Sequence, residues 1–261
     1  MEIGVAGKHA IVTGASKGIG LAITQALVRE GAYVTAGARE SGPELERMSD
    51  ASEVQSITVD LSSPTGPDEL VAAALGHAPV DILINNVGAV TPRLEGFLAI
   101  TEEQWAHSLT LNLLAAVRTT RATLPGMIAA AHGTIVTISS VNASLPDPAV
   151  IDYGAAKAAL TNFCKALSKE VGPHGIRVNT ISPGPVSTAL WLGASGVAQT
   201  IAAARGSDPK LIAEHAVADT ATKRFTTAEE IADLVLLLAG DRAANITGED
   251  IIIDGGLTQS L

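Results

Sequence analysis

The sequence is poor in cysteine, aromatic residues and charge, and each shortage excludes a class of protein. Cys164 is the only cysteine in 261 residues, so an internal disulfide is impossible, and we expect a buried, inert thiol there. Aromatic residues make up 3% of the chain, so aliphatic side chains must fill the core, which is typical of a parallel sheet covered by helices. Hydrophobic residues make up 47% and charged residues 17%, which excludes a disordered chain.

The chain also lacks a basic cluster and a long apolar run. A net charge of −10 repels phosphate backbones and anionic lipids, so we expect no nucleic-acid partner and no membrane partner. The N-terminal MEIGVAGK has no apolar core of signal-peptide length, and the run from Leu234 to Ala239 is too short to span a bilayer. These features predict a cytoplasmic protein.

No metal site is indicated by the histidines. They are scattered and form no H-x-x-H or H-E-x-x-H spacing, so we expect them to be surface or hydrogen-bonded residues. The six are His9, His77, His107, His132, His174 and His215.

Short apolar runs alternate with longer helix-like segments along the whole chain. Strands are expected at His9–Thr13, Tyr33–Ala38, Val54–Val59, Asp81–Asn85, Thr134–Ser139, Arg177–Ser182 and Asp250–Ile253. Helices are expected at Ile19–Glu30, Glu102–Ala131, Ala149–Val171 and Ala228–Ala239, among others. This alternation implies right-handed crossovers and a doubly wound parallel α/β sheet.

Seven strands in this length leave no room for a second domain, so we expect residues 1–261 to form a single domain. The longest irregular stretch, about 183–227, lies between the sixth and seventh strands. A connection of that length usually carries function or mobility. We interpret it as a lid over a site, with a plain surface excursion as the alternative.

A glycine-rich stretch follows the first strand and opens the first helix. It reads Thr13-Gly14-Ala15-Ser16-Lys17-Gly18-Ile19-Gly20. Glycines there let the backbone turn tightly and approach a pyrophosphate, which then sits on the helix N-terminus. The position between strand and helix predicts a dinucleotide site, and a structural strand-to-helix turn is the alternative.

The end of the second strand favours NADP over NAD. No Asp or Glu stands at its tip to bind a ribose 2′-hydroxyl; Arg39 stands there instead, and Lys17 offers a second cation. A guanidinium binds a 2′-phosphate bidentately, whereas a carboxylate repels it. The alternative is that both are ordinary surface cations, with NAD(H) as the cofactor.

Tyr153 and Lys157 are four residues apart in a helical stretch, which puts both side chains on one face. A free tyrosine has a pKa near ~10, so it needs help to act as an acid or base at neutral pH. A neighbouring ammonium favours the phenolate and should lower that pKa. The pair is a candidate proton donor to a nascent alkoxide.

Together these motifs resemble short-chain dehydrogenases/reductases of the single-domain branch, similar to 3-oxoacyl-ACP-reductase-like oxidoreductases. The matching pieces are Thr13–Gly20, Asn85-Asn86-Val87-Gly88, Ser139-Ser140, Tyr153-x-x-x-Lys157 and Pro183-Gly184. The resemblance runs from the first strand to Gly256 and implies a Rossmann-type, seven-stranded parallel sheet flanked by helices. Val87 replaces a usual alanine and Ala143 a frequent glycine, and neither change removes a functional group.

The resemblance also implies residue roles. Tyr153 would be the general acid in reduction, and Lys157 would lower its pKa and bind the nicotinamide ribose. Ser140, thirteen residues before Tyr153, would hydrogen-bond the substrate carbonyl in preference to Ser139. Asn112 would position a water on Lys157, with a helix-bending polar residue as the alternative. Cofactor contacts would come from Gly14, Ser16, Lys17, Gly18, Ile19, Gly20, Arg39, Asp60, Leu61, Asn86, Gly88, Tyr153, Lys157, Pro183, Gly184, Val186 and Thr188.

The expected activity is reversible reduction of a ketone or aldehyde with NADPH, without a metal. The alternatives are an NAD-dependent secondary-alcohol dehydrogenase of the same family and a non-catalytic NADP(H)-binding regulator. The residues expected around the substrate are mostly apolar, which favours a hydrophobic or acyl-type carbonyl compound over a sugar: Val90, Asn142, Leu145, Pro146, Val150, Trp191 and Leu192. Arg93 could meet an anionic group, although a lone loop arginine is usually solvated. The family resemblance implies a homotetramer, or a homodimer.

Overall fold

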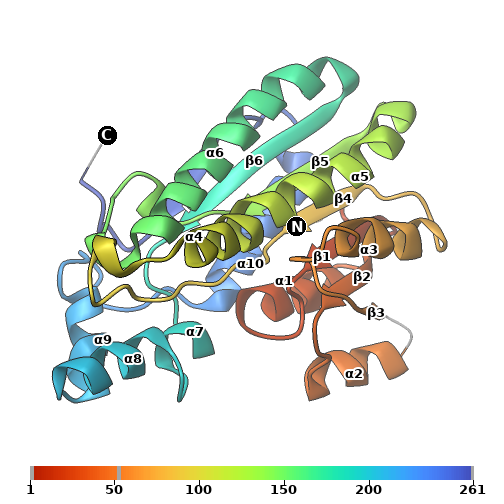
Figure 1. Ribbon diagram of the computed structural model, residues 1–261. Coiled ribbons are helices and arrows are strands. Elements are labelled where there is room, and N and C mark those ends of the chain that lie inside the picture. The colour runs from red at the N-terminus through yellow and green to blue at the C-terminus, as the bar shows by residue number, and fades with distance from the viewer. Residues whose placement is uncertain (1–2, 52–53, 260–261) are drawn as a thin grey trace.

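A computed structural model describes residues 3–51 and 54–259, which form a seven-stranded parallel sheet between two layers of helices (Figure 1). The strands are β1 (His9–Thr13), β2 (Tyr33–Ala38), β3 (Val54–Thr58), β4 (Ile82–Asn85), β5 (Gly133–Ile138), β6 (Ile176–Pro183) and β7 (Asp250–Ile253). They lie in the order β3-β2-β1-β4-β5-β6-β7, and every neighbouring pair is parallel. The predicted doubly wound sheet is therefore confirmed, with strand ends shifted by at most one residue.

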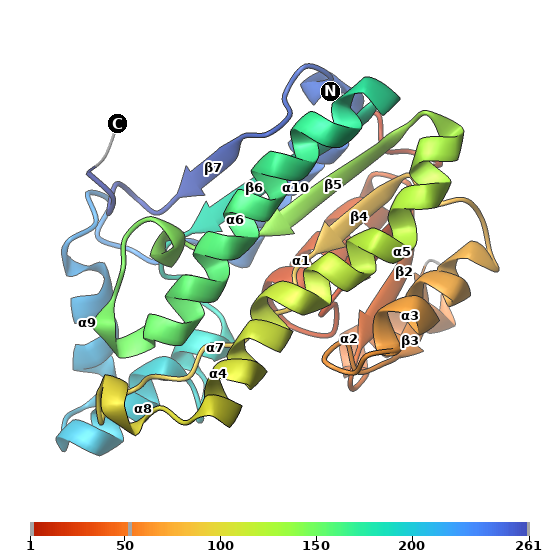
Figure 2. The same cartoon turned by 45° about the horizontal axis from the view of Figure 1, so that its top comes forward.

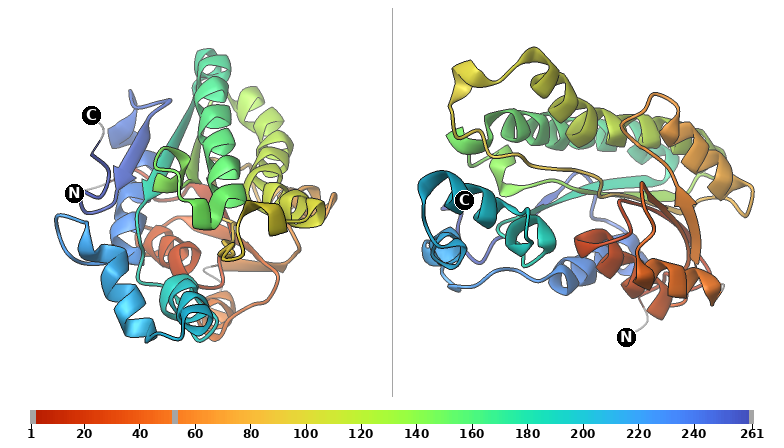
Figure 3. Two further views of the ribbon diagram at one scale, coloured as in Figure 1. Left: turned by 60° about the vertical axis from the view of Figure 1, so that its left-hand side comes forward. Right: turned by 60° about the horizontal axis from the view of Figure 1, so that its bottom comes forward.

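Helices cover both faces of the sheet (Figures 2 and 3). On one face lie α3 (Gly66–Leu75), α5 (Ala115–Ala130) and α6 (Ile151–Val171); on the other lie α1 (Gly18–Arg29) and α10 (Ala228–Ala239), while α2 (Pro43–Asp50) packs beside β3. In the described part of the chain, no helix has both the length and the hydropathy needed to cross a membrane.

Each central strand contributes side chains to two separate hydrophobic cores, because successive side chains point to opposite faces of the sheet. Ala10 and Val12 of β1 belong to the core under α1 and α10, whereas Ile11 between them belongs to the core under α3, α5 and α6. Cys164 of α6 is buried in the second core, and burial raises the pKa of its thiol to about 11. The predicted inert thiol fits this position.

One predicted helix is interrupted. The segment expected as Glu102–Ala131 consists of α4 (Glu102–Leu109), a π-helical turn at Thr110–Leu114, and α5. Asn112 lies in this turn and donates from Nδ2 to the Ser108 carbonyl at 3.0 Å. A polar side chain that bonds to the helix backbone in this way locally disturbs the regular ladder.

The stretch expected to be irregular, about 183–227, is partly helical. It contains α7 (Ala189–Leu192), α8 (Val197–Arg205) and α9 (Pro209–Ala218), which lie together at one end of the molecule (Figure 1). The start of α9 has a typical N-terminal helix cap. Asp208 accepts a hydrogen bond from the Lys210 N–H at 2.8 Å, and Pro209 occupies the first turn.

The carboxyl ends of β1, β4, β5 and β6 meet at the same edge of the sheet. The chain order reverses between β1 and β4, so their connections leave in opposite directions and open a crevice there. The segments that follow these four strands therefore face one another.

A buried ion pair ties two of these segments together. Arg93, in the connection after β4, donates from Nη2 to Oδ2 of Asp152 at 2.5 Å and from Nε to both carboxylate oxygens at 3.2 Å. The two side chains are only 11% and 2% exposed, and the Arg93 N–H also donates to the Ala149 carbonyl. The expectation of a solvated or anion-binding Arg93 was wrong, because Asp152 at the start of α6 already satisfies its charge.

Loss of one partner should leave a buried charge unpaired. We expect Arg93→Ala to lower the free energy of unfolding at neutral pH by about 3 kcal/mol, and Arg93→Met with Asp152→Leu to cost less. Burial opposes ionisation of Asp152, but the hydrogen bonds and charge of Arg93 prevail and lower its pKa below 3.8. The contribution is therefore present above pH 3.8 and is lost as the pH falls through the lowered value.

Urea denaturation of both variants and the wild type, repeated at decreasing pH, measures this contribution. Arg47→Ala is the matched control, because Arg47 pairs with Glu44 on the surface and its loss should cost less than about 1 kcal/mol. Equal losses for Arg93→Ala and Arg47→Ala would contradict the assignment.

Candidate active site

The loop between β1 and α1 is shaped by glycine. The N–H groups of Gly14 and Ala15 both donate to the Gly37 carbonyl of β2, at 2.8 and 3.2 Å. Gly14 and Gly18 have φ angles of +66° and +55°, which favour glycine. A β-carbon on Gly20 would lie 2.2 Å from the Gly14 carbonyl oxygen. No described side chain caps the first turn of α1, so its N–H groups remain available to an anion.

Thr13 and Asn86 join the ends of β1 and β4. The Thr13 hydroxyl accepts hydrogen bonds from the N–H groups of Asn86 and Val87 at 2.8 and 3.1 Å. The Asn86 amide donates to the carbonyls of Thr13 and Gly14 at 2.9 and 3.2 Å. These bonds hold the glycine loop against the segment after β4.

A larger cavity of about 740 Å³ runs over this loop. It is lined by most of the residues predicted to contact the cofactor, namely Gly14, Ser16, Lys17, Gly18, Ile19, Arg39, Asp60, Leu61, Asn86, Gly88 and Thr188. Gly20 does not line it; its role is to let α1 start close to the loop.

The end of the larger cavity at β2 carries charges of both signs. Arg39 and Lys17 line it as expected, and so does Glu40, which the sequence argument overlooked although it directly follows Arg39. Hydrogen bonds from Ser62 lower the pKa of Asp60, and the charge of Arg39 adds a smaller effect. This end can bind a phosphate through its cations, with Glu40 opposing them.

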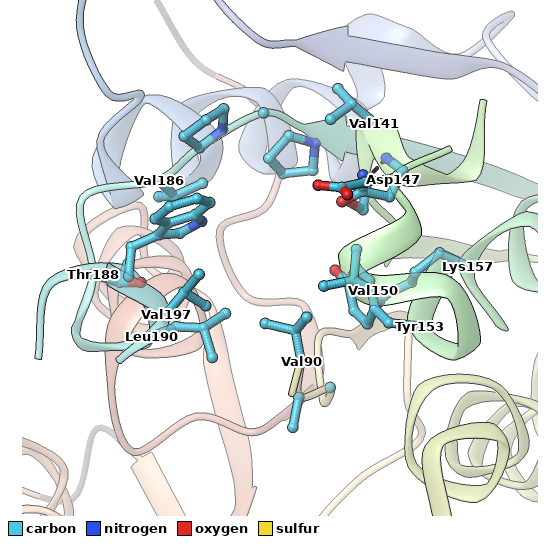
Figure 4. A pocket seen from close by; sticks show the side chains of 18 of the residues that line it. Val90, Val141, Asp147, Val150, Tyr153, Lys157, Val186, Thr188, Leu190 and Val197 are labelled. Carbon is cyan, nitrogen blue, oxygen red and sulfur yellow. Dashed lines mark hydrogen bonds between the residues drawn. The ribbon is translucent and has the colours of Figure 1, made fainter. Parts of the chain in front are cut away.

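A smaller cavity of about 310 Å³ adjoins the larger one and contains the predicted catalytic side chains Ser140, Tyr153 and Lys157. Both cavities share lining residues that include Ile19, Asn86, Gly88 and Thr188. In Figure 4, Tyr153, Lys157, Val150 and Asp147 lie on one side of the smaller cavity and Val186, Thr188, Leu190 and Val197 on the other. A ligand in the larger cavity can therefore reach the three side chains.

Tyr153 and Lys157 are both pushed toward their neutral forms. Burial lowers the pKa of Lys157 to about 8, and its Nζ donates to the Ile138 carbonyl at 2.8 Å. Burial raises the pKa of Tyr153, and a hydrogen bond with Ser140 only partly opposes the rise. Lys157 Nζ lies 5.8 Å from the centre of the Tyr153 ring. The predicted lowering of the Tyr153 pKa by Lys157 is not found: desolvation raises this pKa, and the group that opposes the rise is Ser140 rather than Lys157.

The two serines after β5 have different surroundings. Ser139 bonds to the Thr161 hydroxyl at 2.7 Å and to the Lys157 carbonyl at 3.4 Å, both on α6. Ser140 begins the short 3₁₀ turn Val141–Ala143 and accepts from the Asn142 N–H at 3.2 Å. Ser140 also donates to Asn142 Oδ1 at 3.4 Å and hydrogen-bonds with Tyr153, so it is the serine that meets Tyr153 in the cavity.

Asn112 lines neither cavity but holds the segment that does. Its Oδ1 accepts from the Ala89 N–H at 3.0 Å, and its Nδ2 donates to the Ala89 carbonyl at 2.9 Å. A β-carbon on the neighbouring Gly88 would lie 2.9 Å from this Oδ1 and 3.5 Å from Lys157 Nζ. The π-helical turn thus carries Asn112 to the wall behind Lys157.

The segment after β6 closes the opposite side of the smaller cavity. Pro183, Gly184, Val186 and Thr188 line it, as predicted for cofactor contacts. Of the residues expected around the substrate, Val90, Asn142, Val150 and Trp191 also line it, whereas Leu145, Pro146 and Leu192 are exposed and do not. Asp147, Ile201, Ala216 and Leu257 line it without any local sequence signal, because tertiary packing alone brings them there.

A family model, curated relatives and a solved structure all resemble this chain over nearly its whole length. A family model described as enoyl-(acyl carrier protein) reductase matches residues 14–258. The 3-oxoacyl-acyl-carrier-protein reductase FabG of Escherichia coli is 33% identical over 96% of this chain and 97% of its own. Carbonyl reductase (NADPH) 2 of Sus scrofa is 32% identical over the whole of both chains.

A solved structure also covers the entire chain. The L-sorbose reductase of Gluconobacter frateurii, complexed with NADPH and L-sorbose, superposes with a TM-score of 0.91 at 33% identity over all of both chains. Matches of this length and identity to oxidoreductases, joined to the sheet order and the two adjoining cavities, mean that the chain belongs to the short-chain dehydrogenase/reductase family.

Proposed function

We propose that this protein is an NADPH-dependent oxidoreductase that reduces a ketone or aldehyde to an alcohol. The observation that carries the proposal is the meeting of Ser140, Tyr153 and Lys157 in a cavity that opens into the larger one over the glycine loop. The proposal is also supported by relatives named as carbonyl and 3-oxoacyl reductases and by a structural neighbour complexed with NADPH.

The residues of the larger cavity fit a dinucleotide phosphate. The uncapped N-terminus of α1 and the left-handed Gly14 and Gly18 would hold the pyrophosphate. Arg39 and Lys17 would hold the 2′-phosphate, and Asp60 and Leu61 would contact the adenine. Pro183, Gly184, Val186 and Thr188 would hold the nicotinamide end. When bound, the cofactor supplies a hydride to the carbonyl carbon.

The chain's own residues would provide the proton and the hydrogen bonds. Ser140 donates to the carbonyl oxygen and stabilises the charge that develops on it. Tyr153 gives its phenolic proton to the same oxygen, and its raised pKa keeps that proton in place at neutral pH. Lys157 lies beside the ring and can return a proton to it, while Asn112 holds the wall at Ala89. We propose these four as the catalytic set.

Two alternatives make different demands on the same residues. An NAD-dependent alcohol dehydrogenase of this family would need a hydrogen-bond acceptor at the end of β2, and Glu40 provides one. Arg39 and Lys17 favour NADPH. A non-catalytic NADP(H) sensor would not need Ser140, Tyr153 and Lys157 around one cavity, so their presence favours an enzyme.

We further propose that residues 183–227 act as a lid. This segment contributes Val186 and Thr188 to the cavity, and Thr188 also reaches the glycine loop near Gly18. Closure of such a segment would exclude water during proton transfer. The homotetramer or homodimer implied by the family resemblance stays a prediction.

Tyr153→Phe removes the proposed acid and little else. We expect kcat for ketone reduction to fall by about 10²- to 10⁴-fold, because proton donation in the transition state is lost. NADPH binding, measured by its fluorescence, should persist. Tyr33→Phe is the matched control, since Tyr33 stacks on His77 at 3.8 Å between ring centres and lines neither cavity. Near-normal turnover of Tyr153→Phe would overturn the mechanism.

The direction of the Tyr153 shift predicts a pH asymmetry. Reduction uses the protonated phenol and should stay level from about pH 6 to 8, whereas alcohol oxidation needs the phenolate and should rise toward alkaline pH. Initial rates in both directions, measured across this range in one buffer series, test the prediction. Oxidation that is fastest near pH 6 would contradict it.

Cofactor choice should depend on Arg39. We expect Arg39→Ala to weaken NADPH binding about 10-fold or more while leaving NADH binding nearly unchanged, because only NADPH carries the 2′-phosphate. Glu40→Gln is the paired variant and should strengthen NADPH binding, because it removes a repelling carboxylate from the same cavity. Titration of each variant with both cofactors gives the ratio of the dissociation constants for NADPH and NADH. A wild-type preference for NADH, or no change of the ratio in Arg39→Ala, would favour the NAD-dependent alternative.

A further inference from the structure

Aliphatic side chains from several elements line the smaller cavity, beside the polar groups of the proposed catalytic residues. Its apolar side chains come from the segment after β4, the turn after β5, the start of α6, the segment after β6 and α8; they include Val90, Val141, Val150, Val186, Leu190 and Val197. Figure 4 shows Val90, Val150, Val197 and Leu190 around the open space. Burial of an apolar ligand surface against these side chains is favourable.

Cations near this cavity are already engaged. Lys157 is the only Lys or Arg among the described residues that line it, and its Nζ donates to the Ile138 carbonyl at 2.8 Å. Arg93 is the arginine of the segment after β4, and its guanidinium is paired with Asp152. A substrate carboxylate or phosphate would therefore find no free cation in this wall.

Asp147 is the one carboxylate among the described residues that line the cavity, and its side chain is exposed to solvent. Its Oδ1 accepts from the Ala149 N–H at 2.8 Å, which holds the side chain at the start of the 3₁₀ turn Pro148–Val150. Within the described residues, Oδ2 makes no hydrogen bond and no cation pairs with the group. In Figure 4 it lies on the same side as Tyr153, beyond Val150, toward Val141.

We propose that Asp147 selects the substrate: an apolar ketone that carries a hydrogen-bond donor, neutral or cationic, at a distance from its carbonyl, with anionic ketones rejected. The inference rests on the proposed function, because it assumes that the carbonyl is held by Ser140 and Tyr153. The donor bonds to Oδ2, the apolar body covers the valine side chains, and an anion at the same place is repelled by a carboxylate that no described cation pairs with. The net charge of −10 adds to that repulsion.

A matched set of ketones tests the selection. The set is 4-phenylbutan-2-one and its analogues with a para aminomethyl, hydroxymethyl or carboxylate group, with L-sorbose and a 3-oxoacyl thioester beside them. Oxidation of NADPH by the wild-type protein gives kcat/KM for each. We expect the aminomethyl ketone to exceed the carboxylate ketone by about tenfold or more, with the hydroxymethyl and unsubstituted ketones between them.

Asp147→Asn keeps the hydrogen bond to the Ala149 N–H and removes the charge. The ratio of kcat/KM between the aminomethyl and carboxylate ketones should fall to within about threefold in this variant. Asp208→Asn is the matched control. Asp208 accepts from the N–H two residues ahead at the same 2.8 Å, yet it lines neither cavity, so the ratio should keep its wild-type value.

Each remaining outcome decides against one of the two proposals. Equal or better turnover of the carboxylate ketone, or turnover of L-sorbose or the thioester alone, overturns the selection by Asp147 and leaves the reductase intact. An unchanged ratio in Asp147→Asn does the same. NADPH binding without turnover of any compound in the set overturns the reductase itself, and the selection with it.

Discussion

The parallel pairing of β1, β4, β5 and β6 is the constraint on which the rest of this structure depends. Because all four strands run the same way, their carboxyl ends meet at one edge. The Thr13 hydroxyl joins the first two ends by accepting from Asn86 and Val87. The glycine loop, the serine turn and the segment after β6 are thereby placed opposite one another. Many of the proposed site residues follow from that arrangement, among them Gly14, Asn86, Ser140 and Gly184.

Burial has opposite consequences for the charged groups that this edge brings together. Desolvation is the largest influence on Tyr153 and Lys157 and neither is held in an ion pair, so each is pushed toward its neutral form. Arg93 and Asp152 are also enclosed, but their opposite charges satisfy each other, and Arg93 lowers the pKa of Asp152. The same shielded environment therefore holds a protonated phenol for chemistry and a structural ion pair beside it. Asp147 lines the same cavity but is exposed, and it is the carboxylate that we propose a substrate meets.

Much of the fold and of the site could be predicted because local signals carry them. Buried parallel strands are continuous apolar runs, so the strand ends were placed within one residue. Glycines that must adopt positive φ stand out in a strand-to-helix junction, as at Gly14 and Gly18. A four-residue spacing on a helix puts Tyr153 and Lys157 on one face. These are properties of short segments, so the residues within each segment are enough to predict them.

Other features of the site were decided by the tertiary structure alone, because they depend on contacts between segments that are distant in the sequence. The sequence by itself determined the sheet, the phosphate loop and the Tyr153–Lys157 pair, because each is set by spacing within one element. It could not show that Arg93 is neutralised by Asp152, 59 residues away, or that the Asn112 side chain would disturb its helix while holding Ala89. Nor could it show that Tyr153 has a raised pKa or that Asp147 lines the cavity. Desolvation and pairing act through space, so they exist only once the chain is packed.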